Sequence, residues 1–311
     1  MPQGPRPSPF TTHDGDVILR AGAGSDSRNN FRVHKFILSL ASPVFKDMFT
    51  FPQPSDQNEN EHPDIPVVDI PDSPEVVDTI LRYIYPGVEL PKITEISILS
   101  ALFSAADKYN IASMRPVLKE SLKIFLPREP FGVYIIACRF GLLEEAKEAT
   151  RVSNSRSMLN KGYHEAVQHI SGPDLYRYVQ FIQAREHEGR SEIRRLLGWP
   201  ELGHNVSCGH WDDGEDFYSR LAKEVEDLFV QYPCLELKDL FEVFDRIPDP
   251  PPGCKPEARS ADWYYDGGDD SAFSCPLMPM SIRHNLRGVF VELQALNRRL
   301  LTKAFGKGIG S

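Results

Sequence analysis

Residues Phe31–Thr50 read FRVHKFILSLASPVFKDMFT, and this stretch decides the fold. It begins with a short strand-like segment, 31–33, which we expect to pair with the segment DVILR at 16–20 just upstream. Two short apolar helices follow. Ser42 precedes Pro43 and predicts the start of the second helix, because a serine side chain can accept a backbone N–H that has no partner there.

Both helices carry their apolar residues on one side, which predicts that each buries one face. The first helix, 35–40, presents Phe36, Ile37 and Leu40. The second presents Val44, Phe45, Met48 and Phe49. Two closely joined apolar helices must pack on each other. A strand that leads into such a pair favours an α+β interaction domain over an active site.

Four segments resemble the signature of the BTB/POZ domain family in content, order and spacing. They are DGDVIL at 14–19, FRVHKFILSLASPVFKDMF at 31–49, PVVDIPDSPEVVDTILRYIY at 66–85 and LFSAADKYNI at 102–111. The resemblance implies an α+β BTB/POZ fold, a small three-stranded sheet with packed helices, over residues 14–126. It also implies a protein–protein interaction module and no enzyme activity.

The rest of the chain predicts an all-α domain after the BTB/POZ domain. Residues 1–13 are rich in Pro, Ser and Thr, and we expect a disordered leader. Residues 131–247 predict a helical domain, and 248–279 a loop or linker with the prolines of PDPPPG. The last helix, 280–305, carries a heptad-like apolar stripe that either packs on the helical domain or mediates self-association. Residues 130–151 resemble the helical extension that follows the domain in many fungal BTB proteins.

Composition limits the kinds of partner. The chain has 311 residues, 41% of them hydrophobic and 25% charged, which is typical of globular domains. No apolar run approaches the roughly 20 residues of a membrane helix, and the first ten residues lack a signal-peptide core. Five widely spaced cysteines do not indicate a disulfide framework, so we expect an intracellular protein, cytoplasmic or nuclear. The net charge of −9 argues against nucleic-acid binding.

The family resemblance also suggests a partner surface. BTB adaptors of cullin-type ubiquitin ligases carry a hydrophobic-x-Glu motif just after the second helix of the pair. Phe51 and Gln53 occupy these positions here, so glutamine replaces the acid. In such relatives the turn that AADKYN resembles contributes to the cullin-facing surface, which makes Tyr109 and Asn110 candidate contacts. Phe51 could equally lie under its loop, and Tyr109 could be half-buried packing.

A second candidate surface concerns self-association. Asp16 and Lys35 lie where the family has charged pocket residues near its dimer face. The alternative is local pairing between the hairpin and the helix that follows it. Because swapped BTB dimers use a longer N-terminal leader than this one, the resemblance makes a stable swapped dimer doubtful.

The sequence offers few signals for chemistry. A zinc site could bring together Cys208, His210, Cys254 and Cys275, although the chain has no Cys-x-x-Cys pair and scattered reduced thiols are the alternative. Gly22-x-Gly24 lacks the third glycine of a dinucleotide-binding loop and predicts a hairpin loop. No catalytic signature is present, so we expect neither catalytic residues nor a cofactor.

Three functions follow from these observations. The first is an adaptor that links a client to a cullin-type ubiquitin ligase. The second is a BTB scaffold or transcriptional co-regulator without a ligase role. The third, a metal-dependent enzyme in the C-terminal half, depends only on the scattered Cys and His residues.

Overall fold

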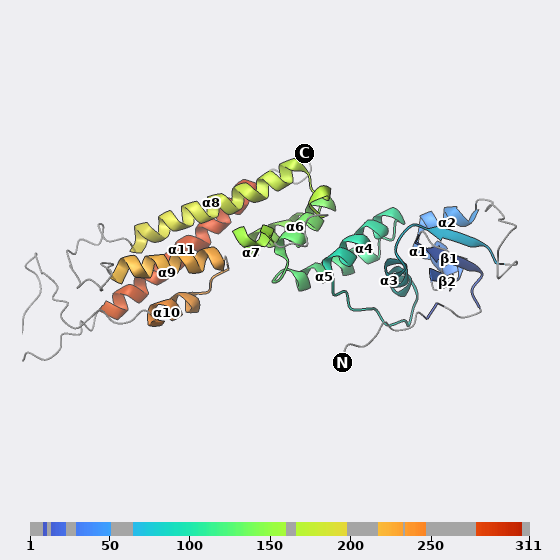
Figure 1. Ribbon diagram of the computed structural model, residues 1–311, viewed down its shortest axis with the longest axis horizontal. Helices are drawn as coiled ribbons and strands as arrows, with labels where there is room; N and C mark the ends of the chain where they lie inside the picture. The colour runs from blue at the N-terminus through green and yellow to red at the C-terminus, as the bar shows by residue number, and fades with distance from the viewer. Residues whose placement is uncertain are drawn as a thin grey trace, which may run out of the picture. The chain divides into compact units, whose positions relative to one another are not determined.

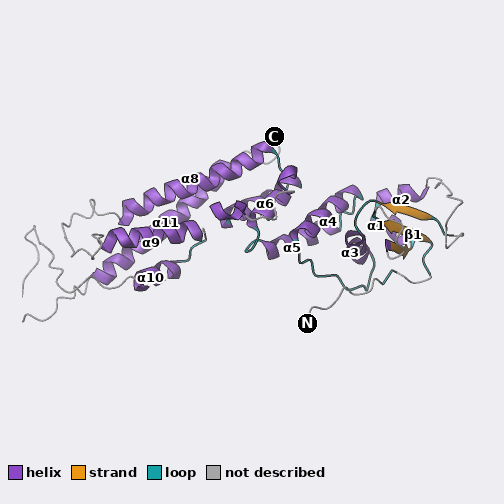
Figure 2. Cartoon of the chain, in the orientation of Figure 1, coloured by secondary structure: helices purple, strands orange, loops and turns teal. Residues whose placement is uncertain are grey.

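The computed structural model describes residues 9–10, 14–22, 29–50, 65–159, 166–197, 217–232, 234–246 and 278–306, without the side chains of 159, 217–219, 244 and 278–285. The chain divides into two compact units, Met1–Glu129 and Pro130–Ser311. Unit 1 holds all the described strands, and the described elements of unit 2 are helical (Figure 2). This agrees with the predicted fold class.

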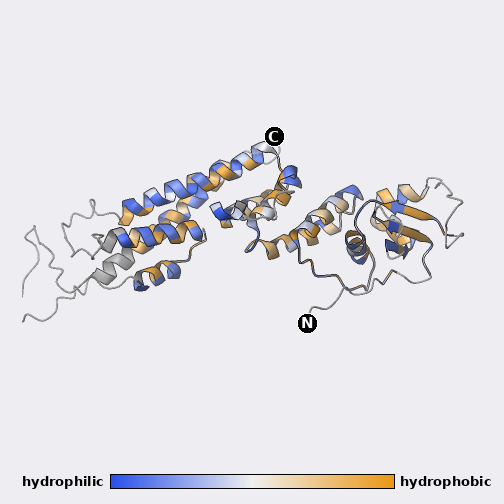
Figure 3. Cartoon of the chain, in the orientation of Figure 1, coloured by the Kyte–Doolittle hydropathy of each residue, from blue (hydrophilic) through white to orange (hydrophobic). Residues whose placement is uncertain are grey.

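The sheet of unit 1 has three strands in the order β2-β1-β3. Strand β1 (Val17–Ala21) pairs antiparallel with β2 (Asn30–Val33), as predicted, and parallel with β3 (Val67–Ile70). The side chains of β1 are almost all buried, as expected for a central strand, and Figure 3 shows the strands coloured as hydrophobic.

Helix α1 (Lys35–Ala41) forms where predicted, but the prediction of its buried face is wrong. Phe36 and Leu40 are each 73% exposed, whereas Leu38 is fully buried. Successive residues of a helix are about 100° apart, so Leu38 lies on the side opposite Phe36 and Leu40. Packing Leu38 into the core therefore turns these two large apolar side chains outward.

Four further helices complete the described part of unit 1 (Figure 1). They are α2 (Pro43–Thr50), α3 (Pro74–Ile84), α4 (Ile96–Lys108) and α5 (Met114–Phe125). Ser73 caps α3, since its Oγ accepts the N–H of Val76 at 3.4 Å. Ser113 has helical backbone angles and makes no side-chain cap at the start of α5.

One residue of the predicted disordered leader is packed. Phe10 is 4% exposed, and its ring lies edge-on to Tyr85 with centroids 5.1 Å apart. Its carbonyl accepts the N–H of Arg32, a residue of the edge strand β2, at 2.8 Å. The expectation of disorder is therefore wrong at this position. The sheet begins to gain backbone partners before the predicted boundary at residue 14.

Unit 2 is helical throughout its described part. Its elements are α6 (Pro130–Arg139), α7 (Leu143–Val152), the 3₁₀ turns η2 (Ser155–Leu159) and η4 (Ala166–His169), α8 (Gly172–Leu197), α9 (Phe217–Gln231), α10 (Leu237–Arg246) and α11 (Met278–Phe305). Helix α11 packs along α8 and also contacts α7 and α10. Its stripe residues Leu286, Val289, Leu293, Leu296 and Leu300 are buried in this packing.

Helix α6 is the most buried element of unit 2. Every residue from Pro130 to Cys138 is buried, which fits a helix that is apolar on all sides. Tyr134 extends this packing, because its hydroxyl donates to the carbonyl of Asp174 on α8 at 2.7 Å. None of the described helices combines the length and apolar composition that crossing a membrane requires.

Candidate functional site

The turn between α4 and α5 is held in a defined shape by its own backbone. Helix α4 ends at Lys108 with Tyr109 as its C-cap, and Asn110 follows with a positive φ of 51°. The N–H of Asn110 donates to the carbonyl of Asp107 at 3.1 Å, and that of Ile111 to Ala106 at 2.8 Å. This pair of bonds is the Schellman motif, in which asparagine tolerates the left-handed conformation better than most residues.

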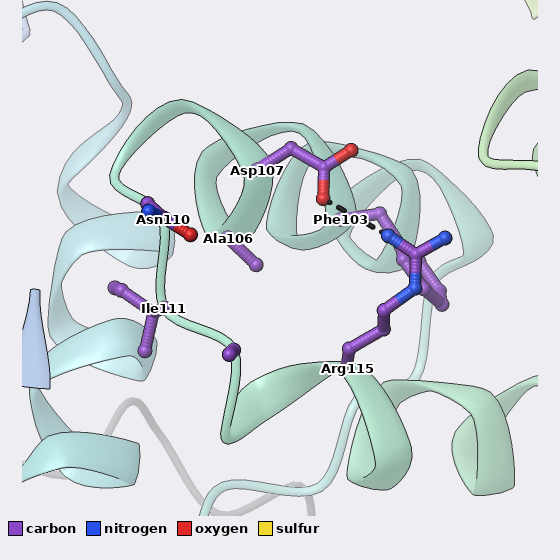
Figure 4. A pocket seen from close by; sticks show the side chains of 7 residues that line it. Phe103, Ala106, Asp107, Asn110, Ile111 and Arg115 are labelled. Carbon is purple, nitrogen blue, oxygen red and sulfur yellow. Dashed lines mark hydrogen bonds and ion pairs between the residues drawn. The ribbon is translucent and has the colours of Figure 1, made fainter.

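A shallow pocket of about 190 Å³ opens beside this turn (Figure 4). It is lined by Phe103, Ala106, Asp107, Asn110, Ile111, Ala112 and Arg115. Phe103 and Ile111 are almost completely buried and form an apolar floor. Arg115 and Asp107 form an ion pair at its edge, with Nη1 and Oδ1 3.3 Å apart, and both side chains are about half exposed. The pocket combines an apolar base with charged, accessible edges.

A buried layer beneath the turn joins it to the α1–α2 junction. Ser42 is fully buried, and its Oγ donates to the carbonyl of Tyr109 at 2.5 Å. The same Oγ accepts the N–H of Phe45 at 3.0 Å, which confirms Ser42 as the start of α2. The rings of Tyr109 and Phe45 stack at 4.7 Å with planes 10° apart. The turn therefore lies on a packed support.

The hydroxyl of Tyr109 is also hydrogen-bonded. It donates to a carboxylate oxygen of Asp72, which also pairs with the ammonium group of Lys108. Burial, with a further contribution from the Asp72 charge, raises the pKa of Tyr109, so the phenol remains a donor at neutral pH. This cluster ties the end of α4 to the residues that precede α3.

The predicted partner contacts differ in their exposure to solvent. Asn110 is exposed at the rim of the pocket, where a partner could reach it. Tyr109 is only 3% exposed, so the structure places its side chain in packing, one of the two alternatives, and not on the surface. Phe51 and Gln53 lie outside the described residues. A contact role for these four residues stays a prediction.

The predicted charged pair is held by a backbone bond. The carboxylate of Asp16 accepts the backbone N–H of Lys35 at 2.8 Å, at the first residue of α1. An acidic group is favourable there because the N-terminus of a helix carries partial positive charge. Asp16 is exposed and the Lys35 side chain is half-buried. The geometry gives Asp16 a capping role and leaves the dimer-face role untested.

His34 and Tyr85 lie next to this pair. The backbone N–H of His34 donates to the Tyr85 hydroxyl at 2.7 Å, and the His34 ring nitrogen Nδ1 lies 3.2 Å from the same oxygen. Burial raises the pKa of Tyr85, and the nearby carboxylates of Asp16 and Asp14 add to the shift. The N-terminus of α1 is thus anchored to the end of α3. The exposed side chains Phe36 and Leu40 extend from this anchored helix.

The metal hypothesis receives no support from the described residues. Among them, no three His, Cys, Asp or Glu side chains gather closely enough to hold an ion. Cys208, His210, Cys254 and Cys275 lie outside the described residues, so the zinc hypothesis stays untested. Cys138 and Cys234 are described and are not in disulfides. Burial raises the pKa of the Cys138 thiol to about 12 and also raises that of Cys234, which keeps both protonated.

Two features of this region were not predicted from the sequence. The first is the pair of Asp107 and Arg115, although an acid near the end of one helix and a base in the first turn of the next could have suggested it. The second is the exposure of Phe36 and Leu40, which were expected in the core. The signal against that assignment was Leu38, an apolar residue on the side of the helix opposite Phe36 and Leu40.

Comparison with known proteins identifies the domain that unit 1 contains. The family model of the BTB/POZ domain matches residues 11–125. The human protein "Kelch repeat and BTB domain-containing protein 8" is 26% identical over 202 residues, which cover 60% of this chain and 31% of the relative. The mouse protein of the same name is 25% identical over the same lengths. The chain thus spans about a third of the length of the curated relatives it matches.

Unit 1 is therefore a BTB/POZ domain, which is a protein-interaction module. The match confirms the domain that the sequence resembled, with its three-stranded sheet and packed helices. The aligned relatives are mammalian, and the closer likeness to fungal BTB proteins stays a prediction.

Proposed function

We propose that this protein is an adaptor that uses its BTB/POZ domain to bind a cullin-type ubiquitin ligase and its helical unit to hold a client. The observation that carries the proposal is the pocket beside the α4–α5 turn. It offers an apolar floor with an accessible ion pair at its edge, in the turn that the family resemblance assigns to the cullin-facing surface. The mechanism is proximity, without covalent chemistry of its own.

The size of the pocket suits one large side chain. About 190 Å³ is smaller than the roughly 300–1,000 Å³ of a small-molecule site, which favours contact with a protein side chain, and the lining residues Phe103 and Ile111 are apolar and buried. Arg115 and Asp107 can exchange their mutual ion pair for charges on a partner, because both are accessible to solvent. Such a site supports a specific protein contact and offers no group placed for catalysis.

Binding of the purified full-length protein to a cullin N-terminal domain tests the proposal. Two variants alter exposed groups at the pocket: Arg115→Glu reverses the rim charge, and Asn110→Gly keeps the left-handed turn but removes the side chain. A third variant, Phe51→Ala, tests the family motif, which lies outside the described residues. Lys123→Gln is the control, since Lys123 is 62% exposed on the same helix as Arg115 but outside the pocket.

We expect Arg115→Glu to weaken binding at least tenfold, because it places two acids together at the pocket edge. Asn110→Gly and Phe51→Ala should weaken it less, and Lys123→Gln should not change it. Absence of binding at tens of micromolar from folded wild-type protein would remove the ligase role. The function would then be that of a BTB scaffold or co-regulator.

A second function, self-association through α1, is favoured by one specific observation. Phe36 and Leu40 lie four residues apart and are each 73% exposed, beside the predicted charged residues Asp16 and Lys35. Exposed apolar side chains that share a helix face are typical of protein–protein contacts. Because Asp16 and Lys35 carry opposite charges, two copies related by a twofold axis could pair them reciprocally.

Sedimentation velocity across a concentration series tests self-association. Phe36→Ser with Leu40→Ser should shift a dimer to monomer, while Ile124→Ser, which removes another exposed apolar side chain of unit 1, should not. A wild-type protein that stays monomeric at high micromolar concentration contradicts this second function. It leaves the adaptor proposal intact.

A further inference from the structure

The hydroxyl of Ser42 connects two elements of unit 1 that are distant in sequence. Ser42 ends α1, where its N–H donates to the carbonyl of Leu38, and it begins α2. Its Oγ accepts the N–H of Phe45 and donates to the carbonyl of Tyr109, at 3.0 and 2.5 Å. One buried oxygen therefore caps the start of α2 and the end of α4 together.

Both of these bonds satisfy backbone groups that would otherwise be unpaired. The first N–H groups and last carbonyls of any helix lack partners within that helix. Ser42 supplies an acceptor to the first and a donor to the second, in a site closed to water. Its loss would leave the buried Tyr109 carbonyl without its hydroxyl donor, which costs more than a solvent-exposed bond would.

We propose that Ser42 is a positioning residue for the interaction surface at the α4–α5 turn. It sets the place of Asn110 and the pocket against α2, whose last residue Thr50 directly precedes Phe51. The stacked rings of Phe45 and Tyr109 lie beside this link and hold its orientation. The effect on a cullin partner rests on the proposed function; the effect on the turn depends on the geometry alone.

Ser73 provides a matched control in the same unit. It is also a serine at a helix start, and its Oγ accepts one N–H, that of Val76. The bonds described for its side chain do not include the α4–α5 turn. Ser73→Ala therefore removes a helix cap, and Ser42→Ala removes a cap and the link to the turn.

Hydrogen exchange on the full-length protein measures directly whether the Ser42 side chain stabilises the α4–α5 turn. In Ser42→Ala we expect the amides of Asn110 and Ile111 to exchange at least about tenfold faster, the effect of losing about 1.4 kcal/mol of local stability. In Ser73→Ala they should remain within twofold of wild type, as should Leu19 of the sheet in both variants. Equal protection of the turn in Ser42→Ala and wild type overturns the inference.

Ser42→Cys covers the case in which the alanine variant does not fold. A thiol has a similar shape but is a weaker donor, so exchange at the turn should lie between wild type and Ser42→Ala. If the cysteine variant exchanges as slowly as wild type while Ser42→Ala is unfolded, the hydroxyl does not position the turn. That result also rejects the inference.

Calorimetric titration with the cullin N-terminal domain then tests whether Ser42 also affects partner binding. Ser42→Ala should bind at least fivefold more weakly than Ser73→Ala, under conditions where both are folded. Equal affinities would reject the positioning role even if the turn exchanges faster. If wild type itself does not bind, the proposed function fails, and the exchange experiment still decides whether Ser42 fixes the turn.

Discussion

The α4–α5 turn of unit 1 and the α7–α8 junction of unit 2 satisfy buried backbone groups in different ways. In unit 1 the support of the α4–α5 turn is a neutral hydroxyl, Ser42, bonded to backbone groups on two helices. At the junction of α7 and α8 in unit 2 the corresponding group is charged. Arg185 is fully buried on α8 and donates to the carbonyls of Ser153 and Arg151, at 2.5 and 3.3 Å, where α7 ends.

Unit 2 repeats this use of charge between α8 and α9. Glu226 is 4% exposed on α9 and accepts two bonds from Arg194, at 2.6 and 3.0 Å, and one from Arg190 at 3.2 Å. Burial lowers the pKa of Arg185 to about 10, which still leaves it charged at neutral pH.

This difference indicates which positions should matter most for the stability of each unit. A neutral cap fixes a short turn locally and leaves the pocket beside it open to a partner. Long arginine side chains reach across helices and fix one helix against another, but each buried charge must keep its partners. We therefore expect unit 1 to be sensitive at its turn support and unit 2 at its charged junctions.

The largest expected effect is at Tyr109, the aromatic part of the turn support. Tyr109→Ala should destabilise unit 1 by about 3–5 kcal/mol, because it opens a cavity beneath the turn beside Phe45. Thermal denaturation followed by circular dichroism, with hydrogen exchange to assign the affected unit, measures this. Protection in α8 should not change.

Tyr109→Phe separates packing from hydrogen bonding. It keeps the stacked ring and removes only the bond to Asp72, which still pairs with Lys108. The expected cost is about 0.5–1.5 kcal/mol. A phenylalanine variant as unstable as the alanine variant would show that the bond, and not the packing, supports the turn.

The second effect concerns the charged junction of unit 2. Arg185→Met keeps an unbranched side chain but leaves the carbonyls of Ser153 and Arg151 without these donors. We expect a loss of about 2–3 kcal/mol, with faster exchange at the end of α7 and little change in unit 1. Hydrogen exchange of the two units in one sample provides the internal control. A stable variant would mean that the bundle does not depend on this charge.

The third effect tests the close approach of α8 and α9. A Cβ atom added at Gly189 would lie 2.2 Å from Cε1 of Phe229, which is buried on α9. Gly189→Ala should therefore destabilise unit 2 by about 1–3 kcal/mol although alanine favours helices. Gly288→Ala on α11 is the control, because nothing lies within 4 Å of its added Cβ. It should be neutral or stabilising.

The positions of helices and strands could be predicted from the sequence better than the face that each helix buries. The pairing of β1 with β2, the α1–α2 pair and the Ser42 cap follow from local signals, namely apolar spacing and serine before proline. The outward position of Phe36 and Leu40 does not, because apolar spacing on a seven-residue helix is compatible with either side. Only the packing of Leu38 against the rest of unit 1 decides between them.

The candidate site was predictable only in part. Asn110 could be located from a family motif, but the pocket needs Phe103 and Arg115, which come together only when α4 and α5 pack. The buried state of Tyr109 depends on Phe45, 64 positions away in the chain. Contacts between distant segments of this kind have no local sequence pattern.

The smallest expected effect on stability comes from a pH-dependent ion pair on the sheet of unit 1. Arg20 on β1 bonds to Asp69 on β3 through two nitrogens, at 2.5 and 2.9 Å, and this bond holds the pKa of Asp69 below its usual value. Asp69 is 69% exposed, so the pair should contribute at most about 1 kcal/mol. Asp69→Asn should remove that amount at pH 7.

The sign follows from proton linkage. Because folding lowers the pKa of Asp69, its contribution is present above the unfolded value, near 3.8, and is lost as the pH falls through the folded value. Wild type and Asp69→Asn should therefore differ at pH 7 and converge in strong acid, as measured by urea unfolding at each pH. In unit 2 the pKa of Glu148 is lowered in the same way by Arg151, and that pair should not respond to Asp69→Asn. A difference between the two proteins that persists unchanged to pH 2 would mean that the aspartate acts through packing and not through its charge.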